Sequence, residues 1–257
     1  MTVDPDRCAA RRVVHLDVVD STQAVAFALA TEGAPDGTTV IADTQTRGRG
    51  RRGRAWYDEP GASLLASIIL RPRLDPAAFP LLSLVAGIAV VGALWASAGL
   101  DARLKWPNDV LVRGRKIAGI LIESRRMAGN DADRAPALAP GTRGGVVVVG
   151  IGINLTQRRF PPPLDGRATS ALLEIGRLID RDRLLAGVLD GLDRWRARLE
   201  AHDFASVRDR WRAIADTLGK TVSVDGIRGV AIDLDQDGAL VVDDGHRRHR
   251  VVAGEVA

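Results

Sequence analysis

The sequence predicts an α+β fold, in which strands and helices form one large domain and a small β-barrel follows. Residues 146–151 are valine and isoleucine apart from one glycine, which is typical of a strand buried on both faces. Residues 81–98 carry no charge and fit a helix surrounded by apolar neighbours. After residue 220 the pattern changes to short β-rich runs separated by Asp-Gly turns, which indicates a barrel of about 40 residues.

The composition is that of a globular protein. Hydrophobic residues make up 46% of the 257 residues and charged residues 26%, which excludes disordered and collagen-like chains. The only cysteine, Cys8, excludes an internal disulfide and an all-cysteine metal site, and it favours a reducing cytoplasm. Asp4 and Asp6, without an apolar region beside them, argue against a signal peptide.

One uncharged segment, residues 76–100, is long enough to cross a bilayer. It is rich in alanine, glycine and serine, and Pro80 suits the first turn of a helix. We therefore expect a buried core helix and no membrane partner.

The formal net charge of +4 is modest, so composition argues only weakly for nucleic acid as a partner. Lys105, Lys116 and Lys220 are the only lysines among the 36 lysines and arginines. Lys105 and Lys116 both fall inside the motifs described below. A compact ammonium group where the chain elsewhere uses arginine suggests a specific requirement at these positions.

Local patterns predict the elements in order along the chain. The predicted strands of the large domain cover residues 13–16, 39–42, 63–70, 110–112, 117–123 and 146–151. Its predicted helices run from an N-cap at Asp20-Ser21-Thr22 to residue 32 and over residues 81–98, 181–200 and 204–215. The predicted barrel strands cover residues 221–224, 229–234, 240–242 and 249–252. We expect a mobile surface loop over residues 127–145 and a boundary that divides residues 1–217 from 218–257.

The most unusual segment is the loop at residues 48–54, Gly-Arg-Gly-Arg-Arg-Gly-Arg. It matches G-x-G-x-x-G, but the following residues 56–61 do not open a helix, and the positions some 20 residues further on are Arg71-Pro72-Arg73 in place of an acid, which excludes a dinucleotide-binding fingerprint. No Walker A motif occurs in the chain. The loop either contacts solvent or nucleic-acid phosphates, or closes its glycines around an anion to which the arginines donate. The second interpretation suits a site that holds a carboxylate against a phosphate.

Three further segments place polar side chains at turns or strand ends. Residues 105–109, Lys-Trp-Pro-Asn-Asp, either present an amide and a carboxylate or form a structural turn. Lys116 precedes Gly119 on a predicted strand, where a ligand could lie close to the backbone; the alternative is an exposed hairpin lysine. Residues 150–154, Gly-Ile-Gly-Ile-Asn, end a buried strand in a flexible turn, for which a plain β-turn is the simpler interpretation.

The conjunction of these segments is more specific than any one of them. In order, they are Asp20-Ser21-Thr22, Gln45-x-x-Gly-Arg-Gly-Arg-Arg-Gly-Arg-x-Trp56, residues 105–109, residues 115–121 and Gly152-Ile153-Asn154. Together they resemble the biotin protein ligases, also called biotin–[acetyl-CoA-carboxylase] ligases. The resemblance extends from residue 13 to the C-terminal strands.

The resemblance implies a mixed β-sheet flanked by helices, of the class II synthetase-like biotin–lipoate ligase fold, and a C-terminal SH3-like barrel. It implies an enzyme that activates biotin with MgATP to biotinyl-5′-AMP and then transfers biotin to one lysine of a biotin carboxyl carrier domain of an acetyl-CoA or acyl-CoA carboxylase. Biotin and ATP are the implied substrates. Mg²⁺ accompanies ATP, through ligands that the sequence does not assign.

By position, the resemblance also implies roles for individual residues. The implied biotin-binding residues are Ser21, Thr22, Gln45, Gly48, Arg49, Lys116 and Gly119. The implied ATP and adenylate contacts are Arg51, Arg54, Trp56, Lys105, Asn108, Lys116 and Asn154. The implied catalytic residues are Lys116, Arg51, Arg49 and Asp109, of which Asp109 would orient the incoming amine.

Elementary chemistry agrees with these roles. A neutral ureido ring needs a few convergent polar groups in an apolar pocket. Attack by a carboxylate on an anionic phosphate needs positioning and cations. The product is a reactive anhydride, so we expect the 48–54 loop to be mobile without ligand and to close over it.

Few residues precede the first predicted strand, so we expect the ligase-only type without a repressor domain and no nucleic-acid partner. Three alternatives remain: a lipoate or octanoate transferase of the same fold, a nucleic-acid-binding module, and a biotin-sensing protein without catalysis. The sequence specifies neither the oligomeric state nor which carboxylase subunit is modified.

Overall fold

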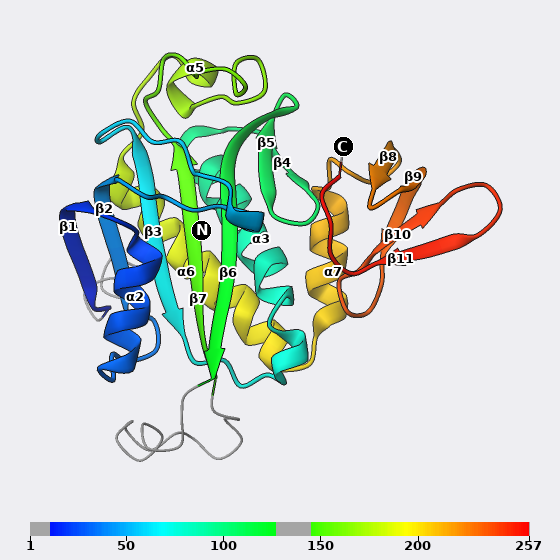
Figure 1. Cartoon of the computed structure of the whole chain (residues 1–257), viewed down its shortest axis with the longest axis horizontal. Coiled ribbons are helices and arrows are strands. Elements are labelled where there is room, and N and C mark those ends of the chain that lie inside the picture. Colours follow the sequence, from blue (N-terminus) through cyan, green and yellow to red (C-terminus); the bar gives the residue numbers. More distant parts are fainter. Residues whose placement is uncertain (1–10, 127–144, 257) are drawn as a thin grey trace.

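The main body of the protein is a mixed seven-stranded β-sheet (Figure 1). The computed structural model describes residues 11–126 and 145–256. β1 and β2 are parallel and every other neighbouring pair is antiparallel, which confirms the mixed sheet. In spatial order the strands are β1 (Val13–Val19), β2 (Thr39–Gln45), β3 (Ser63–Leu70), β7 (Gly145–Asn154), β6 (Arg115–Arg126), β5 (Asp109–Val112) and β4 (Ala102–Lys105).

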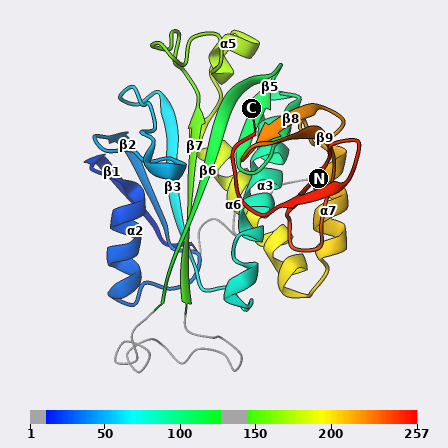
Figure 2. The ribbon, with the colours of Figure 1, turned by 45° about the vertical axis from the view of Figure 1, so that its right-hand side comes forward.

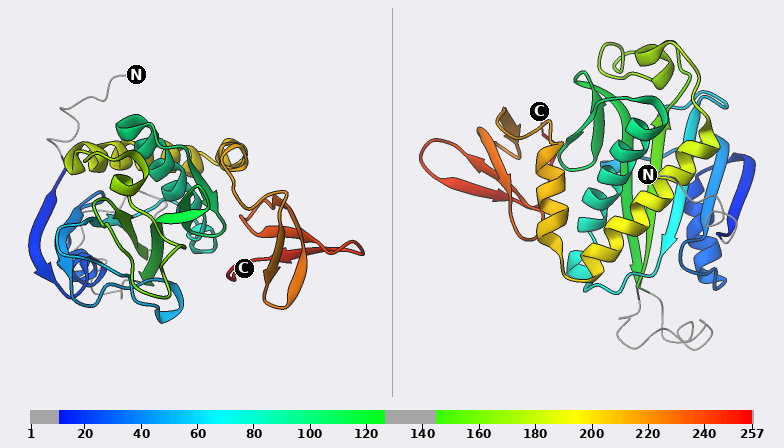
Figure 3. Two further views of the ribbon diagram at one scale, coloured as in Figure 1. Left: turned by 90° about the horizontal axis from the view of Figure 1, so that it is seen from above. Right: turned by 180° about the vertical axis from the view of Figure 1, so that it is seen from behind.

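Helices cover both faces of this sheet (Figures 1 and 3). α2 (Thr22–Thr31) packs on one face, against β2, β3 and β7. α3 (Leu81–Ala98) and α6 (Arg181–Glu200) lie on the other face, with α7 (Phe204–Ala213) beside them. The short helical turns are η1 (Arg51–Gly53), η2 (Pro76–Ala78) and α5 (Ala171–Ile175).

The two faces of β7 differ in a way that positions the functional site. Alternate side chains of this strand join the core cluster that contains α3: Val147, Val149, Ile151 and Ile153. On the opposite face, Val146 and Val148 pack with α2 in a second cluster. The next two residues that point to that face are Gly150 and Gly152. Residues 150 and 152 of β7 therefore present no side chain on the α2 face of the sheet.

α3 is a core helix. It packs between the sheet and α6, and most of its circumference is buried. Within the described ranges it is the one helix long and apolar enough to cross a membrane by length and composition, and 72% of that window is buried in the protein. The contacts of α3 agree with the buried helix that the sequence predicts.

The C-terminal strands form the small antiparallel β unit that the sequence predicts, but its four strands are an open sheet and the barrel is not closed. All neighbouring strands are antiparallel, and among the described residues β8 and β11 do not pair with each other. The buried side chains of this sheet join the same core cluster as α3. Figure 2 shows the sheet beside α7. Because the main body covers the apolar face, the strands need not curl on themselves to bury it. In spatial order they are β11 (Arg248–Val251), β10 (Leu240–Asp243), β9 (Ile227–Leu234) and β8 (Thr221–Val224).

The other differences from the predicted elements are local. β4 and α5 are absent from the sequence prediction: β4 ends in the 105–109 segment interpreted there as a possible turn, and a five-residue helix is too short to show a helical period. α7 ends at Ala213, before the predicted residue 215. The predicted loop over 127–145 lies outside the described residues, apart from Gly145, which begins β7. The division of the chain after residue 217 stays a prediction.

Gly191 of α6 sets the distance between α6 and α3. A Cβ added at Gly191 would lie 3.0 Å from both Cα and Cβ of Ala89. We expect Gly191→Leu to lower the free energy of unfolding by about 1–3 kcal/mol through overpacking, measured by chemical denaturation. Gly92, on the exposed side of α3, has no atom within 4 Å of an added Cβ. Gly92→Ala should therefore leave stability unchanged or raise it by about 1 kcal/mol. Equal effects of the two substitutions would contradict the close helix contact.

Candidate functional site

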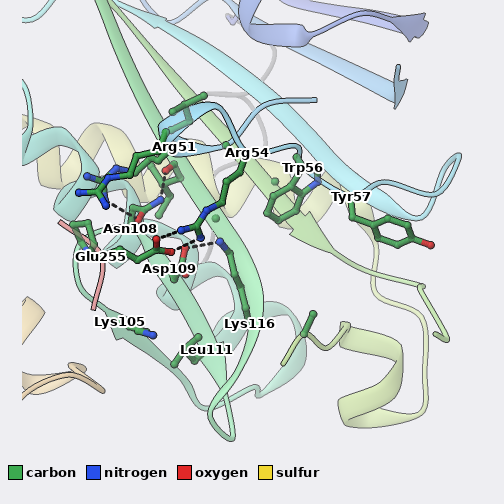
Figure 4. Close-up of a pocket in the computed structure, with 18 of the residues that line it drawn as sticks. Arg51, Arg54, Trp56, Tyr57, Lys105, Asn108, Asp109, Leu111, Lys116 and Glu255 are labelled. Carbon is green, nitrogen blue, oxygen red and sulfur yellow. Dashed lines mark hydrogen bonds and ion pairs between the residues drawn. The ribbon is translucent and has the colours of Figure 1, made fainter. Parts of the chain in front are cut away.

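A cavity of 1110 Å³ opens on the α2 face of the sheet, where β6 and β7 carry glycine. Segments far apart in the sequence meet around it, and Figure 4 shows part of this lining. They are the start of α2, the 48–54 loop with Trp56, the turn at 105–109, residues 160–168, and the C-terminal residues 254–256.

The floor of the cavity consists of glycines over which Trp56 lies. Gly119 of β6 pairs with Gly152 of β7 across the two strands. A Cβ added at Gly152 would lie 2.6 Å from Cε2 of Trp56, and one added at Gly119 would lie 3.0 Å from Cζ3. Only glycine therefore leaves room for the indole. The indole Nε1 is buried and has no hydrogen-bond partner in the described part of the chain.

Polar side chains converge at one end of the cavity. Oε1 of Gln45 accepts a hydrogen bond from the backbone N–H of Thr22 at 2.8 Å and lies 3.1 Å from the Thr22 hydroxyl oxygen. The same hydroxyl lies 2.8 Å from Oγ of Ser67. Ser21 takes the N-cap position of α2, but its side chain makes no capping hydrogen bond and lines the cavity. The structure thus brings together three of the predicted biotin-binding residues.

Gly48 supports the neighbouring loop and does not itself line the cavity. The backbone N–H of Trp56 donates to the carbonyl of Gly48 at 2.9 Å. A Cβ added at Gly48 would lie 3.1 Å from Nε2 of Gln45 and 3.3 Å from Cβ of Trp56. Gly48 therefore allows Gln45 and Trp56 to approach each other.

The arginines of the loop have partners across the cavity, several from the C-terminal end. Nη1 of Arg51 lies 3.3 Å from Oδ1 of Asn108 and 3.3 Å from the carbonyl of Gly254. Arg54 forms an ion pair with Glu255 (Figure 4). Burial, followed by repulsion from neighbouring arginines, lowers the pKa of Arg51, so an anion beside it would be favourable. The remaining pairs are Arg49–Glu123 at 3.1 Å and Arg52–Asp225 at 3.4 Å.

Lys116 and Asp109 face each other inside the cavity (Figure 4). Nζ of Lys116 lies 2.6 Å from Oδ1 of Asp109 and 5.7 Å from the ring centroid of Trp56. The backbone of Lys116 is held by the neighbouring segment 167–169, because its N–H donates to the carbonyl of Arg167 at 2.8 Å and its carbonyl accepts from the N–H of Thr169 at 2.9 Å. The ammonium group therefore stands at a fixed place between a carboxylate and an aromatic ring.

All three lysines of the chain line this cavity: Lys105, Lys116 and Lys220. Lys220 arrives from the segment before β8, and its Nζ pairs with Asp216 at 2.8 Å. The sequence singled out the first two lysines. The third comes to the site only because the C-terminal sheet packs beside the main body.

Asn108 and Asn154 line the cavity, but their amide groups are engaged within the protein. Nδ2 of Asn108 donates to the carbonyl of Ile120 at 2.8 Å, and Nδ2 of Asn154 donates to the carbonyl of Thr169 at 2.9 Å. Both side chains position cavity segments. Their nucleotide contacts stay a prediction.

Several residues of this site were missed from the sequence. Gln23 directly follows the Ser-Thr motif and Ser67 is an isolated serine between apolar residues, which were signals that could have been used. Gly254 and Glu255 carry no local signal. Their place in the site depends on how the C-terminal end packs against the arginine loop.

Asp58 is a half-buried carboxylate behind Gln45. Its Oδ2 accepts a hydrogen bond from the backbone N–H of Gln45 at 3.2 Å. Burial raises the pKa of Asp58 above its ordinary value of 3.8, and the hydrogen bonds only partly oppose this. The carboxylate therefore supports the backbone of Gln45 at a cost to stability.

The chain is similar to known proteins in family, sequence and structure. Residues 15–133 match the model of the Biotin/lipoate A/B protein ligase family. The biotin–[acetyl-CoA-carboxylase] ligase of Paracoccus denitrificans is 36% identical over 246 residues, which cover 92% of this chain and 96% of that protein. The protein of the same name from Mycobacterium tuberculosis is 37% identical over 260 residues, covering 94% and 88% respectively. The structure of the biotin protein ligase from Aquifex aeolicus in complex with biotin and ATP matches with a TM-score of 0.79 and 29% identity, over 96% of this chain and 97% of that chain.

We expect Asp58→Asn to be more stable than the wild type near pH 7 and to lose this advantage in acid. A raised pKa in the folded state means that the folded protein holds the proton more tightly than the unfolded chain. Wild-type stability therefore falls as pH rises from the ordinary value of 3.8 through the folded pKa, whereas asparagine stays neutral. Thermal melts across this pH range provide the measurement. A difference in Tm that is independent of pH would show that ionisation of Asp58 is not its cause.

We expect Gly152→Ala to lower the free energy of unfolding by about 1–3 kcal/mol because the added Cβ displaces the Trp56 indole. In a Trp56→Ala background the same change should cost much less, since the clashing ring is absent. Chemical denaturation of the wild type, the two single variants and the double variant gives the coupling free energy between residues 56 and 152. The same cost in both backgrounds would refute the contact.

Proposed function

This chain belongs to the biotin protein ligases of the biotin/lipoate A/B protein ligase family, and we propose that it activates biotin with ATP to biotinyl-5′-AMP and transfers biotin to a lysine of a carrier domain of an acetyl-CoA or acyl-CoA carboxylase. The observation that carries this proposal is one continuous cavity with buried polar groups at one end and a cluster of cations at the other. Such a cavity can hold a neutral ring and an anionic tail side by side.

The polar end suits the ureido ring of biotin. Thr22 and Gln45 supply a hydroxyl and an amide that are already held in place by each other. Ser21 adds a second hydroxyl at the start of α2. The apolar part of biotin would then extend over the glycine floor beside Trp56, toward Lys116.

In the first half-reaction, a carboxylate oxygen of biotin attacks the α-phosphorus of ATP. The bond from this phosphorus to the bridging oxygen breaks, and pyrophosphate leaves with the electron pair. Both reactants are anionic, so cations placed between them lower the barrier. Lys116 and Arg51 would hold the carboxylate and the α-phosphate together, with Arg49 and Arg54 on the same loop. Nearby Lys105 would add a further positive charge.

Mg²⁺ would bind chiefly to ATP phosphate oxygens and water. Residues 11–126 and 145–256 contain no group of three or more His, Cys, Asp or Glu side chains placed to hold a metal ion. The ion would neutralise charge on the phosphates.

In the second half-reaction, the amine of the carrier lysine attacks the carbonyl carbon of the anhydride and AMP leaves. The amine loses a proton as the amide forms. Asp109 is the carboxylate beside this position, and it would orient the amine once Lys116 turns from it to the ligand. Water must be kept from the anhydride meanwhile, which the 48–54 loop would do by covering the ligand.

The decisive experiment is exchange of labelled pyrophosphate into ATP. We expect exchange that requires biotin and is not supported by lipoate or octanoate. Lys116→Ala should lower kcat/KM by about 100- to 1000-fold because it removes charge stabilisation at the phosphate. Arg228→Ala, on the exposed surface of β9, is the control and should leave exchange unchanged.

Each of the other outcomes has a definite meaning. Exchange that requires lipoate or octanoate would replace the proposed substrate. Near-normal exchange by Lys116→Ala would remove the role assigned to Lys116. Biotin binding without any exchange would favour a binding protein without catalysis.

A further inference from the structure

Two buried polar residues beside Thr22 in the cavity lining, Gln23 and Ser67, have no role in the reaction described above. Gln23 is 3% exposed and Ser67 is 1% exposed. The amide of Gln23 lies over Gly150, where an added Cβ would come within 2.5 Å of Oε1. The missing side chain on β7 therefore makes the space that this amide occupies.

The orientation of the Gln23 amide follows from its partners. Nε2 donates to the carbonyl of Val148 at 3.2 Å, and a carbonyl can only accept. Oε1 therefore points the other way, toward Oγ of Ser67 at 3.1 Å. Since Oε1 is also only an acceptor, Ser67 must donate its proton to Gln23.

The direction of the next hydrogen bond is then determined. Ser67 has used its one proton, so in the 2.8 Å contact with Thr22 it must accept. The reverse direction would leave the buried Oε1 of Gln23 without a donor, which is costly. The Thr22 hydroxyl then donates its one proton to Ser67 and not to Oε1 of Gln45, 3.1 Å away, which still accepts from the backbone N–H of Thr22 at 2.8 Å.

We propose that Gln23, acting through Ser67, orients the Thr22 hydroxyl so that its oxygen can accept a hydrogen bond from a ligand in the cavity. The polar end of the cavity then selects ligands whose ring carries an N–H donor. The proposal rests on the proposed function, in which the donor is an N–H of the ureido ring of biotin. Lipoate and octanoate have no N–H group to offer, so in their complexes a buried acceptor would lack a partner. Gln23 and Ser67 are thus positioning residues for substrate selection.

The first test removes the polar amide of Gln23 with little change in volume. In Gln23→Met the Ser67 proton has no fixed acceptor, so the Thr22 hydroxyl is no longer held in one orientation. We expect the KM for biotin in the exchange assay to rise about 10- to 100-fold, while the KM for ATP and kcat stay within about threefold. The ratio of kcat/KM for biotin to that for octanoate should fall by a similar factor.

A second variant, Ser67→Ala, interrupts the same chain at its next member. If the two residues act in series, Gln23→Met should add little to the effect of Ser67→Ala on the KM for biotin. The matched control is Thr38→Val, because Thr38 is also fully buried and its hydroxyl has no partner in the described residues. It should leave the KM for biotin unchanged. Thermal melts establish that each variant is folded.

A third variant, Gln23→Glu, separates hydrogen-bond direction from packing. When protonated, the glutamic acid donates to the Val148 carbonyl and accepts from Ser67, as glutamine does. When ionised, it has no proton for that carbonyl but still accepts from Ser67, so the direction of the Ser67–Thr22 hydrogen bond is kept in both forms. A folded Gln23→Glu variant should therefore keep the KM for biotin within about threefold of the wild-type value, unlike Gln23→Met.

The outcomes distinguish this proposal from the proposed biotin ligase activity on which it rests. A wild-type protein that neither binds biotin in calorimetry nor supports exchange overturns both. A wild-type protein that uses biotin, with folded Gln23→Met and Ser67→Ala variants of unchanged biotin KM and selectivity, overturns only the role of Gln23 and Ser67. Additive effects of the two substitutions, or a folded Gln23→Glu variant whose KM for biotin rises as much as that of Gln23→Met, also overturn it.

Discussion

The site depends on the absence of side chains at the centre of the sheet. Every other residue of β7 packs in the core cluster that contains α3. These contacts hold the strand in place even where its opposite face has no side chains. On the α2 face, Gly150 and Gly152 leave the backbone bare. The amide of Gln23 and the indole of Trp56 occupy this space directly, and the cavity lies beside them. A single Cβ on either glycine would meet one of these groups.

Around this floor the protein gathers positive charge that it must balance without a ligand. Lys116 is paired with Asp109, and Arg54 is paired with Glu255. Both of these cations thus have a carboxylate partner that an anionic ligand would replace. Replacing a carboxylate partner by an anionic ligand costs less free energy than keeping unpaired cations together in a partly buried site. The positive charges are compensated both before and after the ligand binds.

The C-terminal sheet is part of the site as well as part of the fold. Its apolar face shares the core of α3, which brings Lys220, Gly254 and Glu255 to the cavity wall. Contacts from Arg51 and Arg54 to the C-terminal end tie the arginine loop to this sheet. The geometry of the loop and the docking of the sheet are therefore mechanically linked. A closed barrel would have buried the same apolar face internally and removed the reason for the strands to pack on the main body.

The sequence by itself determined the long elements and the chemistry of the site. Residues 63–70, 81–98 and 181–200 have the periodicity or the apolar length that local structure requires, and the structure has elements with these bounds. The motifs at 45–56, 105–109 and 115–119 were recognisable because neighbouring residues act together there. Only the tertiary structure decided the open C-terminal sheet, the pairing of Lys116 with Asp109, and the place of Gln23, Ser67 and Glu255. The physical reason is that these features arise from contacts between segments distant in the sequence, whereas periodicity reports only what a residue shares with its near neighbours.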